Sequence, residues 1–275
     1  MNSTLSGVSA SILIYDSPVD QVKQAVACLK SEGVQKIFLL YNGGVSGYLK
    51  ASDFPGCEIM EIPNRGYGAG HNVAIRRALE REDTLKPGQE GFHLVMNADV
   101  RWEGDVVSQM VEYMRRNKDV MMMSPKTFYP DGRFQPTARM LPTPLDMALR
   151  LMPRGVMMTR RSRYVLEGMD REKIQNVPYL LGNFMLFRLD AFRVAGLFDE
   201  RFFMYPEDID ISRRMHKIGR TLYYPAVSVI HDHARASRKS LRMFRVHLSN
   251  MARYFSKWGW FYDPERRRMN RRLLR

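Results

Sequence analysis

The sequence predicts an α/β protein with a mostly parallel, mixed β-sheet flanked by helices. Short apolar runs at 11–15, 36–41 and 57–62 are typical of buried strands. Between the first two, the stretch 19–32 carries apolar residues along one side of a helix. Strand–helix–strand order at this spacing favours parallel pairing. Because parallel strands end at one edge of the sheet, the loops after the three runs are expected to share one crevice.

The rest of the chain continues this alternation. Further strands are expected at 92–96, 120–123, 179–189, 222–224 and 227–230. Further helices are expected after a glycine-rich loop at 64–72, at 105–117 and up to about residue 219. Residues 125–144 are rich in Pro and Gly, which favours a loop. Residues 145–170 mix methionine with arginine, which fits either a helical pair on the core or a flexible flap beside a binding site.

The composition limits the class of protein. A chain of 275 residues with 45% apolar residues can bury a sizeable core. Cys28 and Cys57 make no disulfide framework and no metal-ligand spacing, which fits a reducing compartment. The N-terminus lacks the pattern of a signal peptide, and no window of about 18 residues is apolar throughout. A cytoplasmic protein without a membrane span is therefore expected.

Positive charge is concentrated at the C-terminal end. The formal net charge is +14, and from Arg235 onward thirteen Lys and Arg stand against Asp263 and Glu265. The stretch 240–262 has apolar residues at helical spacing with basic residues between them, and it ends in an aromatic cluster. This pattern fits a basic amphipathic helix at an anionic membrane surface, or a helix that packs on the domain with a solvated basic face. We expect a catalytic domain at 1–234 and a basic helical extension at 235–275.

A glycine-rich loop follows the third predicted strand. It runs from Asn64 to Asn72 and has three glycines in five positions, which lets the backbone approach a ligand closely. The N-terminal amides of the following helix favour an anion such as a diphosphate. The pattern alone has low specificity, since glycine loops are often only turns, and its last spacing is one residue short of the dinucleotide fingerprint.

Two polar segments follow predicted strands and suggest a metal. Asp99, in the triplet Asn97-Ala98-Asp99, arrives in the same crevice as the glycine loop, and a carboxylate there suits Mg²⁺ or Mn²⁺ on a substrate phosphate. The alternative is that Asn97 and Asp99 only shape a turn. The triplet His231-Asp232-His233 follows a late strand, and its histidines are either metal ligands or hydrogen-bonded turn residues.

The segment Gly196–Asp210 packs five carboxylates among aromatic rings. Poorly hydrated acids need a partner or a chemical role, so we interpret one of them as a general base at the rim of a pocket. The alternative is a turn and a helix whose first turn is acidic. Upstream, Gly182 interrupts an apolar run, which suggests close approach of a ligand to the backbone.

These motifs together resemble the inverting glycosyltransferases of family 2, which have the GT-A fold. The match is strongest to bacterial rhamnosyltransferases of O-antigen and cell-surface polysaccharide synthesis. The family's glycine loop matches 64–72, its metal motif 97–99, its acidic-aromatic block 196–210 and its late histidine His231. The resemblance covers roughly residues 8 to 260 in order. Any one motif is weak, and four in sequence are strong.

The resemblance implies a role for each matched residue. Asp208 would be the general base, supported by Glu207 and Asp210, while Asp99 and His231 would hold the metal with Asn97 nearby. The residues that would contact the nucleotide base are Tyr15, Asp16, Tyr41 and Asn42. The residues that would line the rest of the donor site are Asn64, Arg65, Gly66, Tyr67, Gly70, Asn72, Asn97, Ala98 and Gly182.

Three positions depart from the family pattern. Tyr41 stands where many members have Asp, and Asp16 where many have Asn, and both changes bear on base recognition. Asn97 replaces the first Asp of the metal motif, which removes one anionic ligand and weakens the expected hold on the metal.

The resemblance further implies Mg²⁺ or Mn²⁺, dTDP-L-rhamnose as the favoured donor, and a polyprenyl-diphosphate-linked saccharide as acceptor. It also implies a peripheral position on the inner face of the cytoplasmic membrane, and a homodimer stays open. The alternatives are a UDP- or GDP-hexose donor, a sugar-nucleotide nucleotidyltransferase, or a basic nucleic-acid-binding protein. The late position of the glycine loop argues against a nucleotidyltransferase. The acidic-aromatic block does not help a protein bind a polyanion, so no nucleic acid is expected.

Overall fold

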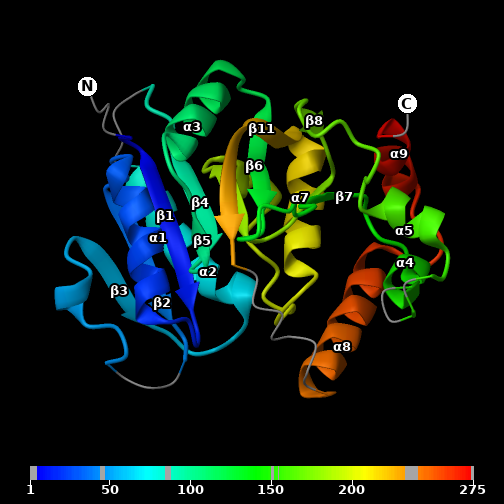
Figure 1. Cartoon of the computed structure of the whole chain (residues 1–275), viewed down its shortest axis with the longest axis horizontal. Coiled ribbons are helices and arrows are strands. Elements are labelled where there is room, and N and C mark those ends of the chain that lie inside the picture. Colours follow the sequence, from blue (N-terminus) through cyan, green and yellow to red (C-terminus); the bar gives the residue numbers. More distant parts are fainter. Residues whose placement is uncertain are drawn as a thin grey trace.

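A mixed β-sheet runs through the computed structural model, which describes residues 5–43, 47–83, 88–149, 152–153, 155–232 and 241–273 (Figure 1). Within these residues the sheet has nine strands in the order β3-β2-β1-β4-β10-β6-β11-β5, with β8 paired to β11. Their bounds are β1 (Val8–Ile14), β2 (Lys36–Tyr41), β3 (Cys57–Glu61), β4 (Phe92–Asn97), β5 (Val100–Arg101), β6 (Val120–Phe128), β8 (Gln175–Asn176), β10 (Phe184–Arg188) and β11 (Arg220–His231). The predicted fold class is confirmed.

The first four long strands are parallel, as the sequence predicts. β1 pairs in parallel with β2 and β4, and β3 pairs in parallel with β2. The crossover helices are α1 (Val19–Ser31) and α2 (Tyr67–Glu82). The carboxyl ends of these strands therefore meet at one edge, where the predicted donor-binding loops begin.

Helices cover both faces of the sheet. Apolar residues of α1 and of α3 (Val106–Arg116) belong to one buried cluster with the side chains of one sheet face. Residues of α2, of α6 (Ala191–Ala195) and of α7 (Glu207–Ile218) belong to a second cluster. α7 begins with the acidic triplet that the sequence singles out, so the sheet and its second cluster fix the position of Asp208.

Four details differ from the sequence prediction. The predicted loop at 125–144 is partly wrong, because β6 extends to Phe128 and β7 (Ala138–Arg139) pairs with β9 (Tyr179–Leu180). The predicted strand at 179–189 is two strands, β9 and β10, separated at 181–183. The predicted strand pair near 222–230 is one strand with an irregularity between Tyr224 and Ser228. The glycine loop ends early, since α2 already begins at Tyr67.

The predicted helix at 240–262 is confirmed over Leu241–Trp258, but its predicted C-terminal end is wrong. α8 (Leu241–Trp258) ends at Gly259, whose φ of +103° suits a glycine. α9 (Pro264–Arg272) then starts, with the Asp263 carboxylate accepting a hydrogen bond from the Arg266 amide and Pro264 at its first position. The sequence contains both the glycine and the Asp-Pro start of α9. The apolar residues at helical spacing continue past them, however, and predict one unbroken helix.

The C-terminal helices pack on the rest of the chain (Figure 1). Residues of α8 and α9, among them Met251, Phe255 and Met269, share a buried cluster with Phe202 and Ile209. The short helices α4 (Pro144–Leu149) and α5 (Met158–Tyr164) contribute to the same cluster. The expected domain boundary at residue 234 falls outside the described residues and stays a prediction. None of the described helices has the length and apolar character needed to cross a bilayer.

Candidate active site

Asp99 and His231 lie side by side because β5 pairs with the end of β11. In this antiparallel pair His231 stands opposite Val100, and the Asp232 amide donates to the Asp99 carbonyl at 3.0 Å. The Asp99 Oδ1 atom is 3.3 Å from His231 Nε2. His233, the other histidine that the sequence suggests, lies outside the described residues. Two strands far apart in the sequence thus bring the two predicted metal ligands together.

Gln135 sets the orientation of the His231 ring. Its Oε1 atom lies 3.0 Å from His231 Nδ1, and both side chains are buried. Because a carboxamide oxygen only accepts, Nδ1 is the donor in this contact, which leaves Nε2 as the ring nitrogen that could bind a cation beside Asp99. Sequence reasoning missed Gln135, because it lies in a segment that carries no motif.

Tyr67 contacts both Asn97, which lies near the predicted metal ligands, and Gly182, which lies between β9 and β10. Its hydroxyl lies 3.1 Å from Asn97 Oδ1 and 2.5 Å from the Gly182 carbonyl oxygen. Burial raises the pKa of Tyr67 well above its usual value, with the charges of Glu207, Asp208 and Asp99 adding to the effect, so the hydroxyl stays a donor. The other side of the Asn97 carboxamide, Nδ2, is 3.4 Å from His231 Nε2.

Asp208 lies at the opposite end of this series of contacts. Its Oδ2 atom accepts from the Gly182 amide at 3.2 Å and from the Tyr179 hydroxyl at 3.3 Å, and its Oδ1 accepts from the Ile209 amide at 2.8 Å. The contacts therefore run without a break from Asp208 through Gly182, Tyr67 and Asn97 to His231. Tyr179 is a second residue that sequence reasoning missed, since it reads as an ordinary strand aromatic.

The neighbouring carboxyls of Asp208 and Glu207 differ in how their surroundings shift the pKa. Burial raises the pKa of Asp208 to about 6, while the amides of Gly182 and Ile209 and the positive charge of Arg139 act against burial. Burial and the negative charge of Asp208 raise the pKa of Glu207 well above its usual value. The hydrogen bonds and the cation thus favour the ionised form of Asp208 over that of Glu207, which makes Asp208 the better proton acceptor.

Arg139 is the cation beside Asp208. It stands opposite Tyr179 in the β7–β9 pair, and its guanidinium is 6.0 Å from the centre of the Tyr164 ring. Its Nε atom is buried and has no hydrogen-bond partner among the described residues. Sequence reasoning missed this residue, because the sequence predicts a loop where β7 lies.

The predicted base-contacting residues lie at the carboxyl ends of β1 and β2. Tyr15 is 61% exposed and Asp16 is exposed, while Tyr41 is buried and stacks on Tyr48 with ring centres 5.0 Å apart. A side chain at Gly43 would come within 2.3 Å of the Tyr15 carbonyl oxygen, so the two loops touch. Asn42 Nδ2 reaches Asn64 Oδ1 at 3.3 Å, which brings in the loop after β3. The three loops therefore adjoin one another at one edge of the sheet.

The glycine-loop residues divide into exposed and buried ones. Asn64 and Arg65 are exposed beside Gly66, whose φ is +104° and where a Cβ would meet the Phe203 carbonyl oxygen at 2.2 Å. The carboxamide of buried Asn72 donates to the Phe198 carbonyl and accepts from its amide, so Asn72 ties α2 to the acidic-aromatic segment. Gly70 and Ala98 are buried, and a Cβ at Gly70 would meet the Leu13 side chain at 2.6 Å. Their roles toward a donor stay predictions.

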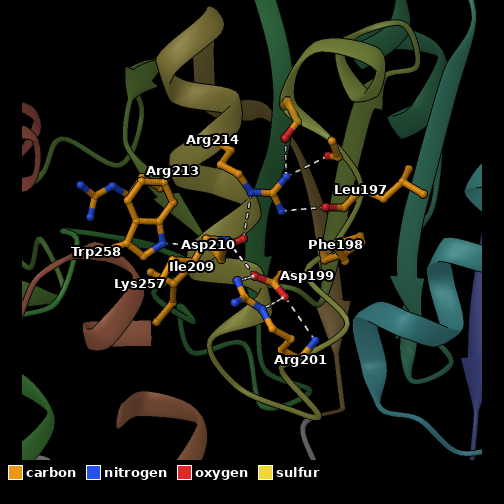
Figure 2. A network of polar contacts seen from close by, with 12 residues as sticks. Leu197, Phe198, Asp199, Arg201, Ile209, Asp210, Arg213, Arg214, Lys257 and Trp258 are labelled. Carbon is orange, nitrogen blue, oxygen red and sulfur yellow. Dashed lines mark hydrogen bonds and ion pairs between the residues drawn. The ribbon is translucent and has the colours of Figure 1, made fainter. Parts of the chain in front are cut away.

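Asp210 faces away from Asp208 and toward the C-terminal helix. Figure 2 shows its carboxylate between Arg214 of α7 and the side chains of Lys257 and Trp258 of α8, with contacts of 2.7–2.8 Å. Lys257 also reaches Asp199, which itself binds Arg201. Asp210 is fully buried, so it supports Asp208 indirectly, by fixing α7.

The residues near Asp99 fit a divalent cation that a substrate also binds. The described part of the chain contains no group of three or more His, Cys, Asp or Glu arranged to hold a metal. The Asp99 carboxylate oxygen and His231 Nε2 are two atoms of types that bind divalent cations, and they lie 3.3 Å apart. Asp99 and His231 can therefore supply two ligands, leaving positions for phosphate oxygens and water.

Comparison with solved structures defines the fold. GalNAc-T7, crystallised with UDP, GalNAc and Mn²⁺, aligns with a TM-score of 0.58 at 14% identity, over 83% of this chain and 44% of that one. The mannosyltransferase PcManGT of Pyrobaculum calidifontis, in complex with GDP-Man and Mn²⁺, aligns with a TM-score of 0.55 at 12% identity, over 91% of this chain and 63% of that one. The chain thus spans about half to two thirds of these neighbours and shares their fold.

Curated relatives add the enzyme class. The N-acetylglucosaminyl-diphospho-decaprenol L-rhamnosyltransferase of Mycobacterium tuberculosis is 28% identical over 238 residues, 82% of this chain and 76% of the relative. This protein is a GT-A glycosyltransferase. Rhamnosyltransferase WbbL of Escherichia coli K12 is 29% identical over 202 residues, which cover 70% of this chain and 71% of WbbL. No protein-family model matches the chain.

Proposed function

We propose that this glycosyltransferase moves L-rhamnose from dTDP-L-rhamnose, with inversion, onto a hydroxyl of a polyprenyl-diphosphate-linked saccharide. The observation that carries this proposal is the unbroken series of contacts from Asp208 through Gly182, Tyr67 and Asn97 to His231 and Asp99. These contacts support Asp208 as the base and Asp99 and His231 as cation ligands, because they connect the three side chains within one small region. Inverting transfer needs this pairing, because the base and the leaving group lie on opposite faces of the sugar.

The donor end uses the loops at the carboxyl edge of the parallel strands. Asp99 and His231 would hold Mg²⁺ or Mn²⁺, and a bound cation would neutralise the negative charge that builds on the departing phosphate. α2 begins at Tyr67, beside Asn97, so its positive N-terminal end favours a diphosphate at the same place. The Mn²⁺ complexes of the two structural neighbours support this assignment.

The acceptor end uses Asp208. Its carboxylate takes the proton of the acceptor hydroxyl, the hydroxyl oxygen forms a bond to the anomeric carbon, and the bond from that carbon to the phosphate oxygen breaks to release dTDP. The Gly182 and Ile209 amides and the Tyr179 hydroxyl orient the carboxylate for this step. Burial and the charge of Asp208 raise the pKa of Glu207, which disfavours a second negative charge beside the base.

Rhamnose as the sugar rests on both curated relatives, and a lipid diphosphate as the acceptor carrier rests on the mycobacterial one. A lipid-linked acceptor implies work at the inner face of the cytoplasmic membrane, and exposed Phe244 and Leu248 on basic α8 support contact with an anionic membrane surface. A homodimer stays a prediction from the sequence.

The test is a transfer assay with purified protein. dTDP-L-rhamnose and a synthetic N-acetylglucosaminyl-diphospho-lipid should give a rhamnosylated product with inverted anomeric configuration, and EDTA should abolish the product until Mn²⁺ or Mg²⁺ is restored. A parallel thermal-shift screen of dTDP-, UDP- and GDP-sugars should show a metal-dependent shift with the dTDP sugar. Selective stabilisation and turnover with a UDP- or GDP-hexose instead would favour the alternative donors.

A further inference from the structure

A groove rich in arginine lies between α5 and α9. Its volume is about 580 Å³, and its walls include Arg160 and Arg163 on one side and Arg266, Arg267 and Arg271 on the other. Its floor is the segment at Met140 and Leu141, which the Asn270 carboxamide holds through two hydrogen bonds of 2.9 Å to the Leu141 backbone. The groove is therefore part of the fold and not a gap between loosely placed helices.

Two of the five arginines build the groove and three are available to a ligand. Arg160 binds the one acidic residue of the lining, Asp146, at 2.7 Å. Arg266 is buried and lies near Asp263 and the Pro142 carbonyl. Arg163, Arg267 and Arg271 are exposed, and none of them forms an ion pair within the described parts of the chain. Three uncompensated guanidinium groups around one groove favour a multiply charged anion such as a diphosphate.

Apolar side chains accompany this charge. Met157 and Tyr164 line the groove, and so does Phe261, which is 83% exposed in the turn between α8 and α9. A free phosphate ion gains nothing from such surfaces. An amphiphile with a phosphate head and a hydrocarbon tail fits both parts of the lining.

The groove is also close to the proposed base. Tyr164, in its wall, lies 6.0 Å from the Arg139 guanidinium, and the Met140 amide donates to the Tyr164 carbonyl at 3.0 Å. Arg139 stands opposite Tyr179, and Tyr179 contacts Asp208. A ligand in the groove would thus be separated from the base by one strand pair, which suits the carrier end of the same acceptor molecule.

We propose that this groove binds the diphosphate and the first part of the hydrocarbon tail of the lipid-linked acceptor, a proposal that rests on the proposed function. The acceptor sugar then extends past Arg139 toward Asp208. Bulk anionic phospholipid is the competing source of a phosphate head, and it needs neither an enclosed groove nor a position beside the base. The exposed face of α8 is the better candidate for that contact.

The test is donor-free binding of farnesyl diphosphate, measured by isothermal titration calorimetry on the full chain. The double variant Arg163→Ala/Arg267→Ala should bind at least about tenfold more weakly than wild type, since two charge-assisted contacts are lost. Arg268→Ala is the matched control, because Arg268 is exposed on the same helix and does not line the groove. Arg271→Gln is an independent single variant that should also weaken binding.

Flotation with phosphatidylglycerol vesicles distinguishes the two sources of phosphate. The double variant should float with the vesicles as wild type does, although its binding of farnesyl diphosphate is weakened. Loss of flotation with unchanged farnesyl diphosphate binding would overturn the proposal, as would equal weakening by Arg268→Ala or no binding by wild type. Because no donor is present, failure of sugar transfer with intact binding would count against the proposed function alone.

Discussion

At the residue scale, the chemistry depends on how differently two adjacent carboxyls are surrounded. Asp208 accepts hydrogen bonds from two backbone amides and a tyrosine hydroxyl, and it lies near a guanidinium. Glu207 Oε2 has no hydrogen-bond partner among the described residues. Both are buried at the start of α7. Hydrogen bonds and a nearby cation favour an ionised carboxylate, and burial without them favours a protonated one. The surroundings therefore assign the base.

Arg139 should tune that base. In Arg139→Gln the positive charge near Asp208 is lost, so the pKa of Asp208 should rise and the acid limb of the kcat/KM profile should move to higher pH. Arg139→Lys keeps the charge and should leave the limb near its wild-type position. Arg133→Gln, an exposed change in the same part of the chain, is the control. An unchanged acid limb in Arg139→Gln would show that the guanidinium does not act on the base.

The absence of a side chain at Gly182 should be needed for substrate binding and not for folding. A Cβ there would lie 3.4 Å from Asp208 Cβ and 3.6 Å from Tyr67 Cε1, which are ordinary contacts. Gly182→Ala should thus keep or slightly raise the free energy of unfolding, by about 0.4–1 kcal/mol. It should also lower transfer by on the order of 10²-fold, because the methyl group occupies the space between Tyr67 and Asp208.

The comparison for this variant is Gly66→Ala. Its Cβ would meet the Phe203 carbonyl at 2.2 Å at a φ of +104°, so it should lower the melting temperature. Melting curves and initial rates of both variants check the distinction. Full activity in Gly182→Ala would mean that no substrate atom uses this space.

At the element scale, α7 is held between the sheet and the C-terminal helices. Arg213 of α7 makes two hydrogen bonds of 2.7 Å to Asp263 and two of 2.9 and 3.1 Å to Glu265, and it lies over the Trp258 ring at 4.1 Å. Lys257 and Trp258 bind Asp210 one turn nearer the base (Figure 2). The basic extension is thus a support for the helix that carries Asp208.

Removal of this support should cost stability. Arg213→Met leaves Asp263 buried without its main partner, and an uncompensated buried charge costs about 3–5 kcal/mol. The exposed pair of Arg220 and Asp119 provides the matched control, since Arg220→Met should cost only about 0–1 kcal/mol. Urea unfolding of both variants measures the difference. Equal midpoints would show that the buried pair does not hold α9 to α7.

The sequence predicts the elements best where each signal is local. The strands at 36–41 and 92–97 and the helix at 106–116 follow from apolar periodicity within one segment. β7 and β9 have two residues each, and only their mutual pairing defines them. The break after α8 depends on Gly259 and the Asp263 cap, which compete with an apolar stripe that continues past them.

At the scale of the whole molecule, a buried polar relay of two serines and two histidines connects β1, β4 and α2. His93 contacts Ser9 and Ser11 at 2.8 and 2.9 Å, and Ser11 contacts His71 at 2.8 Å. Burial lowers the pKa of His93 to about 3 and lowers that of His71 well below its usual value. Both rings are therefore neutral in the folded protein, although they would be charged in the unfolded chain in mild acid.

This relay predicts acid sensitivity. Between about pH 6.5 and 3 the unfolded chain binds a proton at His93 that the folded protein does not, so stability should fall as the pH falls through this window. The raised pKa of Asp208 acts in the opposite direction below about pH 6, so the comparison needs a variant. His93→Gln removes the titrating ring, and its melting temperature should fall less than that of wild type between pH 7 and 5. Parallel falls would contradict the assignment.

The site could be predicted only where motifs carry it. Asp99, His231 and Asp208 follow from matched motifs, and the structure places them in one connected region. Gln135, Arg139 and Tyr179 could not be found this way. Each acts through a partner from 29 to 96 residues away, as the Tyr179–Asp208 and Gln135–His231 contacts show, and only the folded sheet brings these partners together.

The most direct test of the central claim compares donor binding with transfer in Asp208→Asn. The variant keeps the size of the side chain and removes its ability to take a proton, so dTDP-L-rhamnose should bind with the wild-type Kd in calorimetry with Mn²⁺. Transfer to the diphospho-lipid acceptor should fall by about 10²–10⁴-fold. Near-wild-type turnover by Asp208→Asn would show that another group takes the proton and would contradict the account.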